Sequence, residues 1–471
     1  SHRNAIPAVG GAREAAGHPG TLDARTSHKR HCELMSDEPA PKRLTREIGT
    51  FGAVMMGLGS IVGTGVFVSI GIAAGVAGPA VVIAVAVGAM VATFNGLSSA
   101  QLAANHAVSG GTYEYGYTFL SPTFGFTAGW MYLIAKSASA ATAALGFSGY
   151  LLGALGLSMD RWLVPVALLA VVSLTAVVYS GIRRSNITNI IVVSITLAAL
   201  ALFVVAGSPT AFSDGLSNFS NFFEAPEGGG GWRAVLYASA LMFVAYTGYG
   251  RIATLGEEVR APRTTIPRAI IVTLVVTMVL YGAVAVVGVG AVGVDTLSAA
   301  TAEQAAPLEV AARAFGVPGV SQVVAFGAIT AMLGVLLNLI LGLSRVLLAM
   351  GRRADMPHVF GRVNEEGTTP GPAVLMMGTV IAAIALIGDV RVTWSFSAFT
   401  VLVYYAITNL AALYIPADGR LFPKWVSVAG LVCCSSLAFF VEPLYWGVGL
   451  GLIAAGLAWH ALARQARSTA S

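Results

Sequence analysis

Long apolar segments constrain this chain more strongly than any other feature of its sequence. Twelve of them follow one another, separated by short stretches that contain charged residues, proline or glycine. A helix needs about 20 apolar residues to cross the roughly 30 Å hydrocarbon core of a bilayer. The sequence therefore predicts an all-α integral membrane protein with twelve transmembrane helices, at about residues 50–74, 79–100, 122–151, 160–180, 186–207, 233–255, 267–292, 320–346, 372–388, 393–415, 423–440 and 443–463.

The charge composition agrees with a membrane protein and argues against several other classes. Only 10% of the residues are charged, whereas a soluble domain carries roughly 25%. The formal net charge of +5 resides at the chain ends and in loops, which does not predict nucleic-acid binding. Three cysteines are too few for a Cys-rich metal site. Because the chain has no HExxH, GxSxG or GxxxxGK[ST] motif, we expect neither an enzyme nor a nucleotide-driven pump, and no metal or cofactor.

Lysine and arginine residues divide unevenly between the two sides of the predicted bundle. With the N-terminus inside, the inner loops and the C-terminus carry thirteen of them, and the outer loops carry Arg161, Arg233, Arg313 and Arg391. Positively charged loops remain in the cytoplasm. We therefore predict a multi-pass protein of the cell (inner) membrane whose N- and C-termini are both cytoplasmic.

Four regions follow from this organisation. Residues 1–48 are predicted to form a polar cytoplasmic N-terminal tail. Met35 opens a natural-looking start within it, which would make residues 1–34 an over-called start or non-native residues. Residues 49–416 form a ten-helix core, residues 417–464 two additional transmembrane helices, and residues 465–471 a cytoplasmic C-terminal tail.

Glycines interrupt two of the predicted spans near their middle. Span 1 reads MMGLGSIVGTGVF, with glycines at 57, 59, 63 and 65, and span 6 reads FVAYTGYGRIATLGEE, with Gly248 and Gly250. Glycine is a poor helix former, and unpaired backbone at membrane depth must line a cavity or be buried in protein. The two breaks lie five spans apart, which predicts a five-plus-five inverted repeat around a site at mid-depth. Close helix packing is the alternative reading for any single glycine.

Four stretches resemble the amino acid–polyamine–organocation (APC) superfamily. They are GSIVGTGVF in span 1, HAVSGGTYEYGYTFLSPTFGFTAGW at 106–130, FVAYTGYGRIATLGEEVRAPRTTIPRAI at 243–270 and SRVLLAMGRRADMPHVFGRVNEEGTTPGPAV at 344–374. The resemblance covers about residues 45–415. It implies a LeuT-like fold with discontinuous spans 1 and 6, and an amino acid permease that works by alternating access. A cationic amino acid or polyamine transporter or antiporter, or an inorganic-ion cotransporter of the same superfamily, is the alternative.

The ends of the two broken helices predict an amino acid site. Unused amides at a half-helix N-terminus suit a carboxylate, and free carbonyls beside an unwound segment suit an ammonium group. The amides would be those of Gly63, Thr64 and Gly65. The predicted substrate-binding residues are Ile61, Gly63, Thr64, Gly65, Phe243, Ala245, Tyr246, Gly248 and Tyr249, with Leu133 and Phe399 opposite, and core packing is the alternative for each aromatic. No Asp or Glu lies deep in any span, which favours a neutral amino acid.

Lys136 is predicted to lie near the bilayer midplane. Twelve residues separate it from Phe124 at the cytoplasmic start of span 3, which corresponds to about 18 Å of helix. A charge at that depth is costly and indicates function, and burial favours the neutral amine. We predict that Lys136 is the coupling residue, which either exchanges a proton or replaces a sodium ion with its fixed charge. A snorkelling lysine is the structural alternative, and superfamily members with a comparable lysine carry it in span 5, where this chain has Ser194 and Thr196.

Sodium coupling is less expected than proton coupling. The sodium site of the resembling fold takes hydroxyls from span 8, but residues 331–343 contain no Ser or Thr. Thr330 and Asn338 are the oxygen-bearing candidates that remain.

Charged residues at the cytoplasmic ends of spans 1 and 6 predict an inner gate. Arg46 precedes span 1, Arg251 follows the break in span 6, and Glu257 and Glu258 end that span. Pairs that form when the exit closes and part when it opens would bias two states, although interfacial anchoring is the alternative. We thus expect a secondary active transporter whose partners are an amino acid, a proton and membrane lipid, as a monomer or homodimer.

Overall fold

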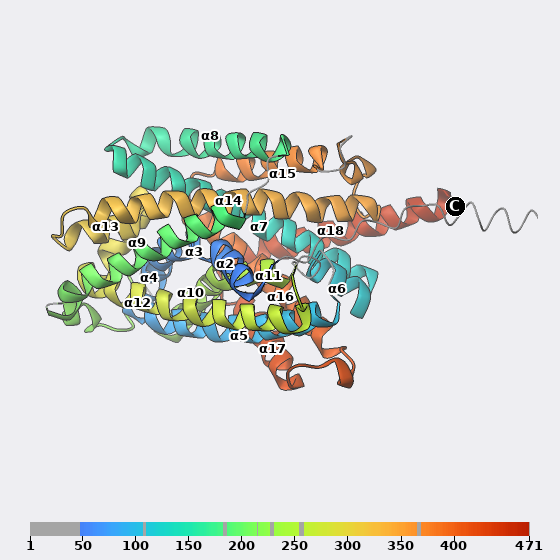
Figure 1. Cartoon of the computed structure of the whole chain (residues 1–471), viewed down its shortest axis with the longest axis horizontal. Helices are drawn as coiled ribbons and strands as arrows, with labels where there is room; N and C mark the ends of the chain where they lie inside the picture. Colours follow the sequence, from blue (N-terminus) through green and yellow to red (C-terminus); the bar gives the residue numbers. More distant parts are fainter. Residues whose placement is uncertain are drawn as a thin grey trace, which may run out of the picture. The chain divides into compact units, whose positions relative to one another are not determined.

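The computed structural model describes residues 48–106, 110–181, 186–213, 215–226, 230–253, 259–364 and 369–470, with only the helical backbone for residues 466–470. These residues are helical apart from connecting turns and one isolated bridge between Ile48 and Val259. Figure 1 shows how the helices are arranged.

In chain order they are α2 (Thr50–Ile61), α3 (Thr64–Phe67), α4 (Ser69–Ala77), η1 (Gly78–Ala80), α5 (Val81–Asn105), α6 (Thr112–Phe119), α7 (Pro122–Leu155), α8 (Met159–Tyr179), α9 (Asn186–Ser213), η2 (Gly215–Phe219), α10 (Gly231–Tyr246), η3 (Thr247–Tyr249), α11 (Gly250–Ala253), α12 (Pro262–Gln304), α13 (Pro307–Ala314), α14 (Val320–Arg352), η4 (His358–Gly361), α15 (Gly371–Ala385), α16 (Val390–Leu413), η5 (Ala417–Gly419), α17 (Lys424–Ala438) and α18 (Pro443–Ala470).

The apolar helices confirm an all-helical membrane protein. Among the described residues, eight stretches are long and apolar enough to cross a membrane, and the shorter apolar helices α2, α15 and α17 accompany them. The eight stretches are fewer than the twelve predicted spans partly because Thr64–Asn105 counts as one stretch. Helix α10, with 16 residues, falls below the length of about 20 residues that a full crossing requires.

Helix starts follow the predicted spans closely, but several helices end later than predicted: α9 at Ser213, α14 at Arg352, α18 at Ala470 and, most of all, α12 at Gln304. The prediction ends this span at residue 292, and Gly293 indeed leaves the helical conformation, with φ 75° and ψ 167°. A second helical part then continues to Gln304. A positive φ is readily available only to glycine, so the predicted span ends at this kink and a second helix follows it.

Helix α7 lies at the centre of the packing that positions the site. Its most extensive contacts are with α16 and α14. Two hydroxyl pairs join α7 to α16: Ser139 Oγ lies 2.8 Å from Ser397 Oγ, and the Thr142 hydroxyl donates to Thr393 Oγ1 at 2.8 Å. Such small polar residues let membrane helices approach closely and replace the hydrogen bonds that lipid cannot provide.

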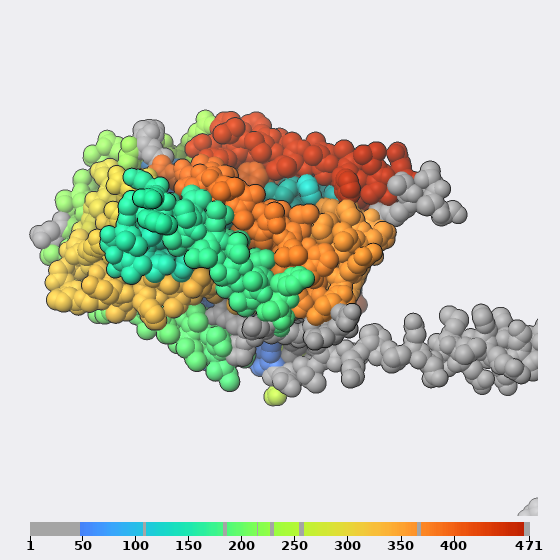
Figure 2. All heavy atoms as spheres, turned by 90° about the horizontal axis from the view of Figure 1, so that it is seen from above, coloured from blue at the N-terminus to red at the C-terminus, as the bar shows by residue number. Residues whose placement is uncertain are grey.

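Helix α18 borders this core and remains mostly uncovered. It packs against α16 and α7, and the space-filling view shows it, in red, along one face of the molecule (Figure 2). Only 17% of the apolar 18-residue stretch in this helix is buried inside the protein. This is the exposure expected of a helix whose remaining surface meets lipid.

The first predicted break is present and is narrower than the glycine pattern indicates. Helix α2 ends at Ile61, Val62 is extended with φ −79° and ψ 98°, and α3 starts at Thr64. Gly57 and Gly59 lie within regular helix. A Cβ on Gly57 would lie 2.9 Å from Ile252 Cγ1, and one on Gly59 would lie 2.9 Å from Val193 Cγ2. These two glycines therefore serve close packing. The helix is interrupted at Val62–Gly63 and again at Val68, where φ is −122° and ψ is −47°.

The second break is a tightened turn. Helix α10 ends at Tyr246, one 3₁₀ turn covers Thr247–Tyr249, and the short α11 follows. A 3₁₀ segment within a helix is typical of a functional hinge or a strained sequence. The two breaks adjoin each other, because a Cβ on Gly65 would lie 2.8 Å from Ala245 Cβ and 3.0 Å from Ala245 O.

Candidate substrate site at the two helix breaks

Unused hydrogen-bond donors gather at the first break. Among the described residues, no backbone carbonyl accepts from the amides of Gly63, Thr64 or Gly65. The Thr64 hydroxyl is also buried and has no hydrogen-bond partner in that part of the chain. Unpaired donors in a buried place are costly and point to a ligand that accepts hydrogen bonds. This is the location predicted for the carboxylate of an amino acid.

Lys136 lies at the second break. Its Nζ donates to Thr247 Oγ1 at 2.7 Å, and the residue is 8% exposed. The Thr247 hydroxyl in turn donates to Val244 O at 2.8 Å. Since Thr247 opens the 3₁₀ turn, the ammonium group of Lys136 is attached to the segment where span 6 departs from α-helix. The burial argues against a snorkelling lysine.

Tyr281 of α12 caps the carbonyls predicted to receive a substrate ammonium group. Its hydroxyl donates to Ile61 O at 2.9 Å and lies 3.5 Å from Ala245 O. One side chain therefore contacts the ends of both interrupted helices. Sequence reasoning missed Tyr281, because it lies inside an apolar span with no neighbouring motif.

Tyr405 of α16 has a similar role at the second break and was also missed. Its hydroxyl donates to Thr247 O at 3.0 Å. Its ring packs edge-on against Phe243, with 5.5 Å between ring centroids, and lies 5.5 Å from the ring of Tyr249. Phe243 and Tyr249 are fully buried, so both of these predicted aromatics face α16.

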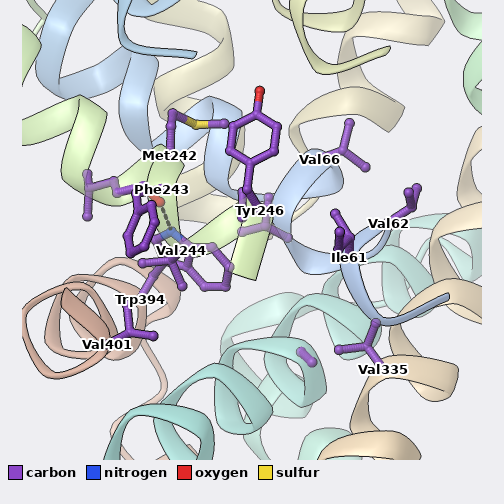
Figure 3. Packing of buried hydrophobic residues seen from close by; sticks show 14 of the residues in the cluster. Ile61, Val62, Val66, Met242, Phe243, Val244, Tyr246, Val335, Trp394 and Val401 are labelled. Atoms are coloured by element: carbon purple, nitrogen blue, oxygen red, sulfur yellow. Dashed lines mark hydrogen bonds between the residues drawn. The ribbon is translucent and has the colours of Figure 1, made fainter. Parts of the chain in front are cut away.

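Tyr246 and Phe399, the other two predicted aromatics, have different partners from Phe243 and Tyr249. The Tyr246 hydroxyl donates to Val85 O at 3.4 Å, and its ring packs on Tyr281, 5.0 Å between centroids. Figure 3 shows Tyr246 and Phe243 leaving α10 in different directions, with Ile61 and Val62 on the far side of Tyr246 from Phe243. Phe399 stacks edge-on with Phe439 at 6.4 Å. Gly248 lies at the second break, where an added Cβ would contact Ser60 O. Leu133 is buried on α7, with 6% of its surface exposed.

The predicted gate is described only in part. Arg46, Glu257 and Glu258 lie outside the described residues. Arg251 belongs to the short α11. The described segments next to these residues are paired through their backbones, because the Arg260 amide donates to Ile48 O at 2.9 Å.

Of the two oxygen-bearing residues considered for sodium, Thr330 is engaged within its own helix. The Thr330 hydroxyl donates to carbonyls of its own helix, to Phe326 O at 3.0 Å and to Gly327 O at 3.1 Å. Asn338 is half-buried on the same helix. The described residues contain no group of three or more His, Cys, Asp or Glu that could hold a metal ion.

Comparison with known proteins identifies the family. The family model described as amino acid permease matches residues 52–440. An uncharacterized transporter of Mycobacterium tuberculosis is 39% identical over 435 residues, covering 92% of this chain and 95% of the relative. A branched-chain amino acid permease of Bacillus subtilis is 29% identical over 374 residues, covering 75% and 77%.

A plant relative extends the range of substrates found among the relatives. The chloroplastic cationic amino acid transporter 7 of Arabidopsis thaliana is 26% identical over 438 residues, covering 86% of this chain and 71% of the relative. The matches confirm the resemblance read from the sequence motifs. The chain is a transporter rather than an enzyme, and it belongs to the amino acid permease family of the APC superfamily.

Proposed function

We propose that the protein is a secondary active transporter that moves neutral amino acids across the cell membrane by alternating access. The observation that carries this proposal is the set of unused donors at Gly63, Thr64 and Gly65, beside a buried Thr64 hydroxyl without a partner among the described residues. In the proposed architecture, twelve crossings include a five-plus-five inverted repeat, and both termini are cytoplasmic. The donors bind the substrate carboxylate.

The substrate ammonium group is proposed to compete with Tyr281. Ile61 O accepts a hydrogen bond from the Tyr281 hydroxyl at 2.9 Å, and an ammonium group has three donors of its own. Binding would release Tyr281 from the ends of the two breaks. A ligand that contacts one state differently from the other shifts the balance between them.

Neutral amino acids are preferred because the site has no acidic partner. In the described part of the chain, the buried carboxylates are Glu309 of α13 and Asp355 after α14, and both lie outside the predicted spans. A cationic side chain would also meet the ammonium group of Lys136. The branched-chain permease among the relatives agrees with this preference, whereas the plant cationic amino acid transporter supports the alternative.

Lys136 is proposed to couple substrate movement to a proton. A charged amine inside a membrane protein is costly, and loss of its proton would remove the charge and leave an amine that can still donate to Thr247. Replacement Lys136→Met removes the ammonium group and keeps the length of the side chain. We expect uptake into proteoliposomes to lose its dependence on pH, whereas Lys424→Met, on the exposed start of α17, keeps it. Unchanged proton-driven uptake in the Lys136 variant would contradict the coupling role.

A ligand screen tests the substrate. The purified protein is melted with each of the twenty amino acids and with common polyamines, at pH 5.5 and 7.5, with and without sodium. A ligand that binds the folded state raises the melting temperature by mass action. A shift confined to neutral amino acids supports the proposal. A shift confined to arginine, lysine or polyamines would replace it with the cationic alternative, and sodium dependence would remove proton coupling.

A further inference from the structure

A cavity of about 500 Å³ lies away from the two breaks, where the end of α7 meets α13 and the start of α14. Its lining includes Gly153, Glu309, Arg313, Gln322, Phe326 and Ile329. Figure 2 shows the teal segment that follows α7 beside the yellow segment of α13 and α14. This is the end of the bundle that the charge distribution places outside. None of these residues belongs to the proposed substrate site.

Glu309 brings an unsatisfied buried charge to this cavity. Its side chain is 4% exposed, and its Oε1 accepts from Arg313 Nε at 2.6 Å. Its Oε2 is buried and has no hydrogen-bond partner in the described part of the chain. A carboxylate oxygen left without a donor is costly. The cavity therefore suits a ligand that carries a hydrogen-bonding cation.

Arg313 adds the opposite charge at the mouth of the cavity. Its side chain is 52% exposed, and its Nη2 donates to Gly153 O at 3.3 Å. A carboxylate and a guanidinium group in one cavity complement a zwitterion, with the ligand's cation at Glu309 and its anion at Arg313.

The wall formed by α14 becomes apolar away from these charges. Gln322, Phe326 and Ile329 follow at spacings of four and three residues, which places them on one face of the helix. They span seven residues, or about 10 Å. Phe326 is 57% exposed, so the apolar part opens outward. A polar end followed by an open apolar groove matches a lipid headgroup and the start of its acyl chain more closely than it matches a free amino acid.

We infer that this cavity binds the headgroup of a zwitterionic phospholipid with a primary amine, of the phosphatidylethanolamine type. The ammonium group donates to Glu309 Oε2, the phosphate lies near the Arg313 guanidinium group, and an acyl chain follows Phe326 and Ile329. A choline headgroup has no N–H and cannot satisfy the Glu309 oxygen. The site therefore distinguishes these two lipids.

Hydrogen bonds connect the cavity to the first interrupted span. The Leu308 amide, next to Glu309, donates to the Tyr150 hydroxyl at 3.2 Å, and that hydroxyl donates to Phe67 O at 2.7 Å. Phe67 ends α3. A bound headgroup would hold α13 in place and, through Tyr150, the half-helix that carries the unused amides. This regulatory consequence rests on the proposed transport function, whereas lipid binding does not.

Lipid-dependent melting of the purified, delipidated protein tests the binding. Phosphatidylethanolamine is expected to raise the melting temperature of the native protein, and phosphatidylcholine with the same acyl chains to raise it less. Glu309→Gln should weaken the affinity for phosphatidylethanolamine about tenfold, since it removes a hydrogen bond to a charged group. Glu303→Gln, on the exposed part of α12, should leave the affinity unchanged. Equal responses to the two lipids, or an unchanged response in Glu309→Gln, would overturn the inference.

Two further arms make the result unambiguous. Free ethanolamine and free neutral amino acids are tested with both the native protein and Glu309→Gln. If one of these soluble amines raises the melting temperature of the native protein but not of Glu309→Gln, the ligand of this cavity is a soluble amine and not a lipid. If Glu309→Gln does not fold, Arg313→Gln replaces it as the test variant, because Arg313 is half-exposed. Arg313→Gln should also weaken phosphatidylethanolamine binding. Amino acid binding measured separately, in detergent without lipid, distinguishes failure of this inference from failure of the proposed function.

Discussion

Thr64 is a buried threonine whose hydroxyl has no partner in the described residues. Replacement by valine preserves its shape and removes the hydroxyl, so Thr64→Val should leave the free energy of unfolding nearly unchanged. If the hydroxyl binds the substrate carboxylate, the variant should bind the amino acid about tenfold more weakly, the value for one hydrogen bond to a charged group. Calorimetry or a ligand-dependent melting series measures both quantities.

Thr142 provides the matched control for Thr64. Its hydroxyl is equally buried but donates to Thr393 Oγ1 at 2.8 Å. Thr142→Val should cost about 1 kcal/mol of stability, because it removes one hydrogen bond while the Thr393 hydroxyl keeps its bonds to Asp389 O and Val390 O, and should leave substrate affinity unchanged. The assignment of Thr64 to the site would fail if both variants had the same effect on affinity.

At the scale of elements, the contact between the two interrupted helices depends on Gly65. An added Cβ would lie 2.8 Å from Ala245 Cβ and 2.9 Å from Ala245 Cα, and backbone cannot shift as easily as a flexible side-chain end. Gly65→Ala should therefore separate the breaks and abolish most transport. Initial uptake rates at equal protein amounts measure this effect.

Gly282 in α12 is the control for this prediction, because an added Cβ would meet nothing within 4 Å. Gly282→Ala should retain transport and gain up to about 1 kcal/mol of stability, since alanine favours helix over glycine. Transport by Gly65→Ala at the native rate would show that close approach of the two breaks is unnecessary.

Helix α6 is attached to the end of α14 by charged and aromatic groups. Glu114 forms a salt bridge with Arg353, whose guanidinium group lies 4.3 Å from the ring centroid of Tyr117. The hydroxyls of Tyr113 and Tyr117 donate to Asp355. Burial raises the pKa of Glu114 above its ordinary value of 4.5, and outweighs the opposing effect of Arg353.

This pKa shift predicts a pH dependence of stability. An acid whose pKa is raised in the folded state contributes stability that is fully present below pH 4.5 and is lost as the pH rises through the raised pKa. Glu114→Gln cannot titrate, so melting temperatures between about pH 4 and pH 7 should fall less steeply in the variant. Glu224→Gln, at an exposed residue, should follow the native protein. Parallel curves for Glu114→Gln and the native protein would contradict the prediction.

At the scale of the whole molecule, the arginine distribution predicts which loops face each side. Ser158, before α8, and Asp418, before α17, are both exposed. In a variant without the three native cysteines, Ser158→Cys should react with an impermeant maleimide from outside the cell. Asp418→Cys should react only after the membrane is opened. The reverse pattern would invert the proposed orientation, and reaction of both from outside would change the number of crossings between them.

Much of the helical organisation could be predicted because it depends on local composition. Lipid requires long apolar segments, and the span expected to end at residue 292 meets its kink at Gly293. The part of α12 beyond Gly293 was not predicted, since its residues are polar enough to read as a loop. The roles of Gly57 and Gly59 also required the structure, because a glycine that permits packing and a glycine that permits unwinding are identical in sequence.

The sequence by itself determined the membrane class, the family and the positions of the two breaks. The membrane class follows from the length of the apolar segments and the breaks follow from glycine density, whereas the family follows from the resemblance of four short stretches to the APC superfamily. Only the tertiary structure decided which side chains complete the breaks. Lys136 meets Thr247, Tyr281 meets Ile61 and Tyr405 meets Thr247. These partners are at least 111 residues apart, and their contacts depend on how separate helices pack, which no local pattern encodes.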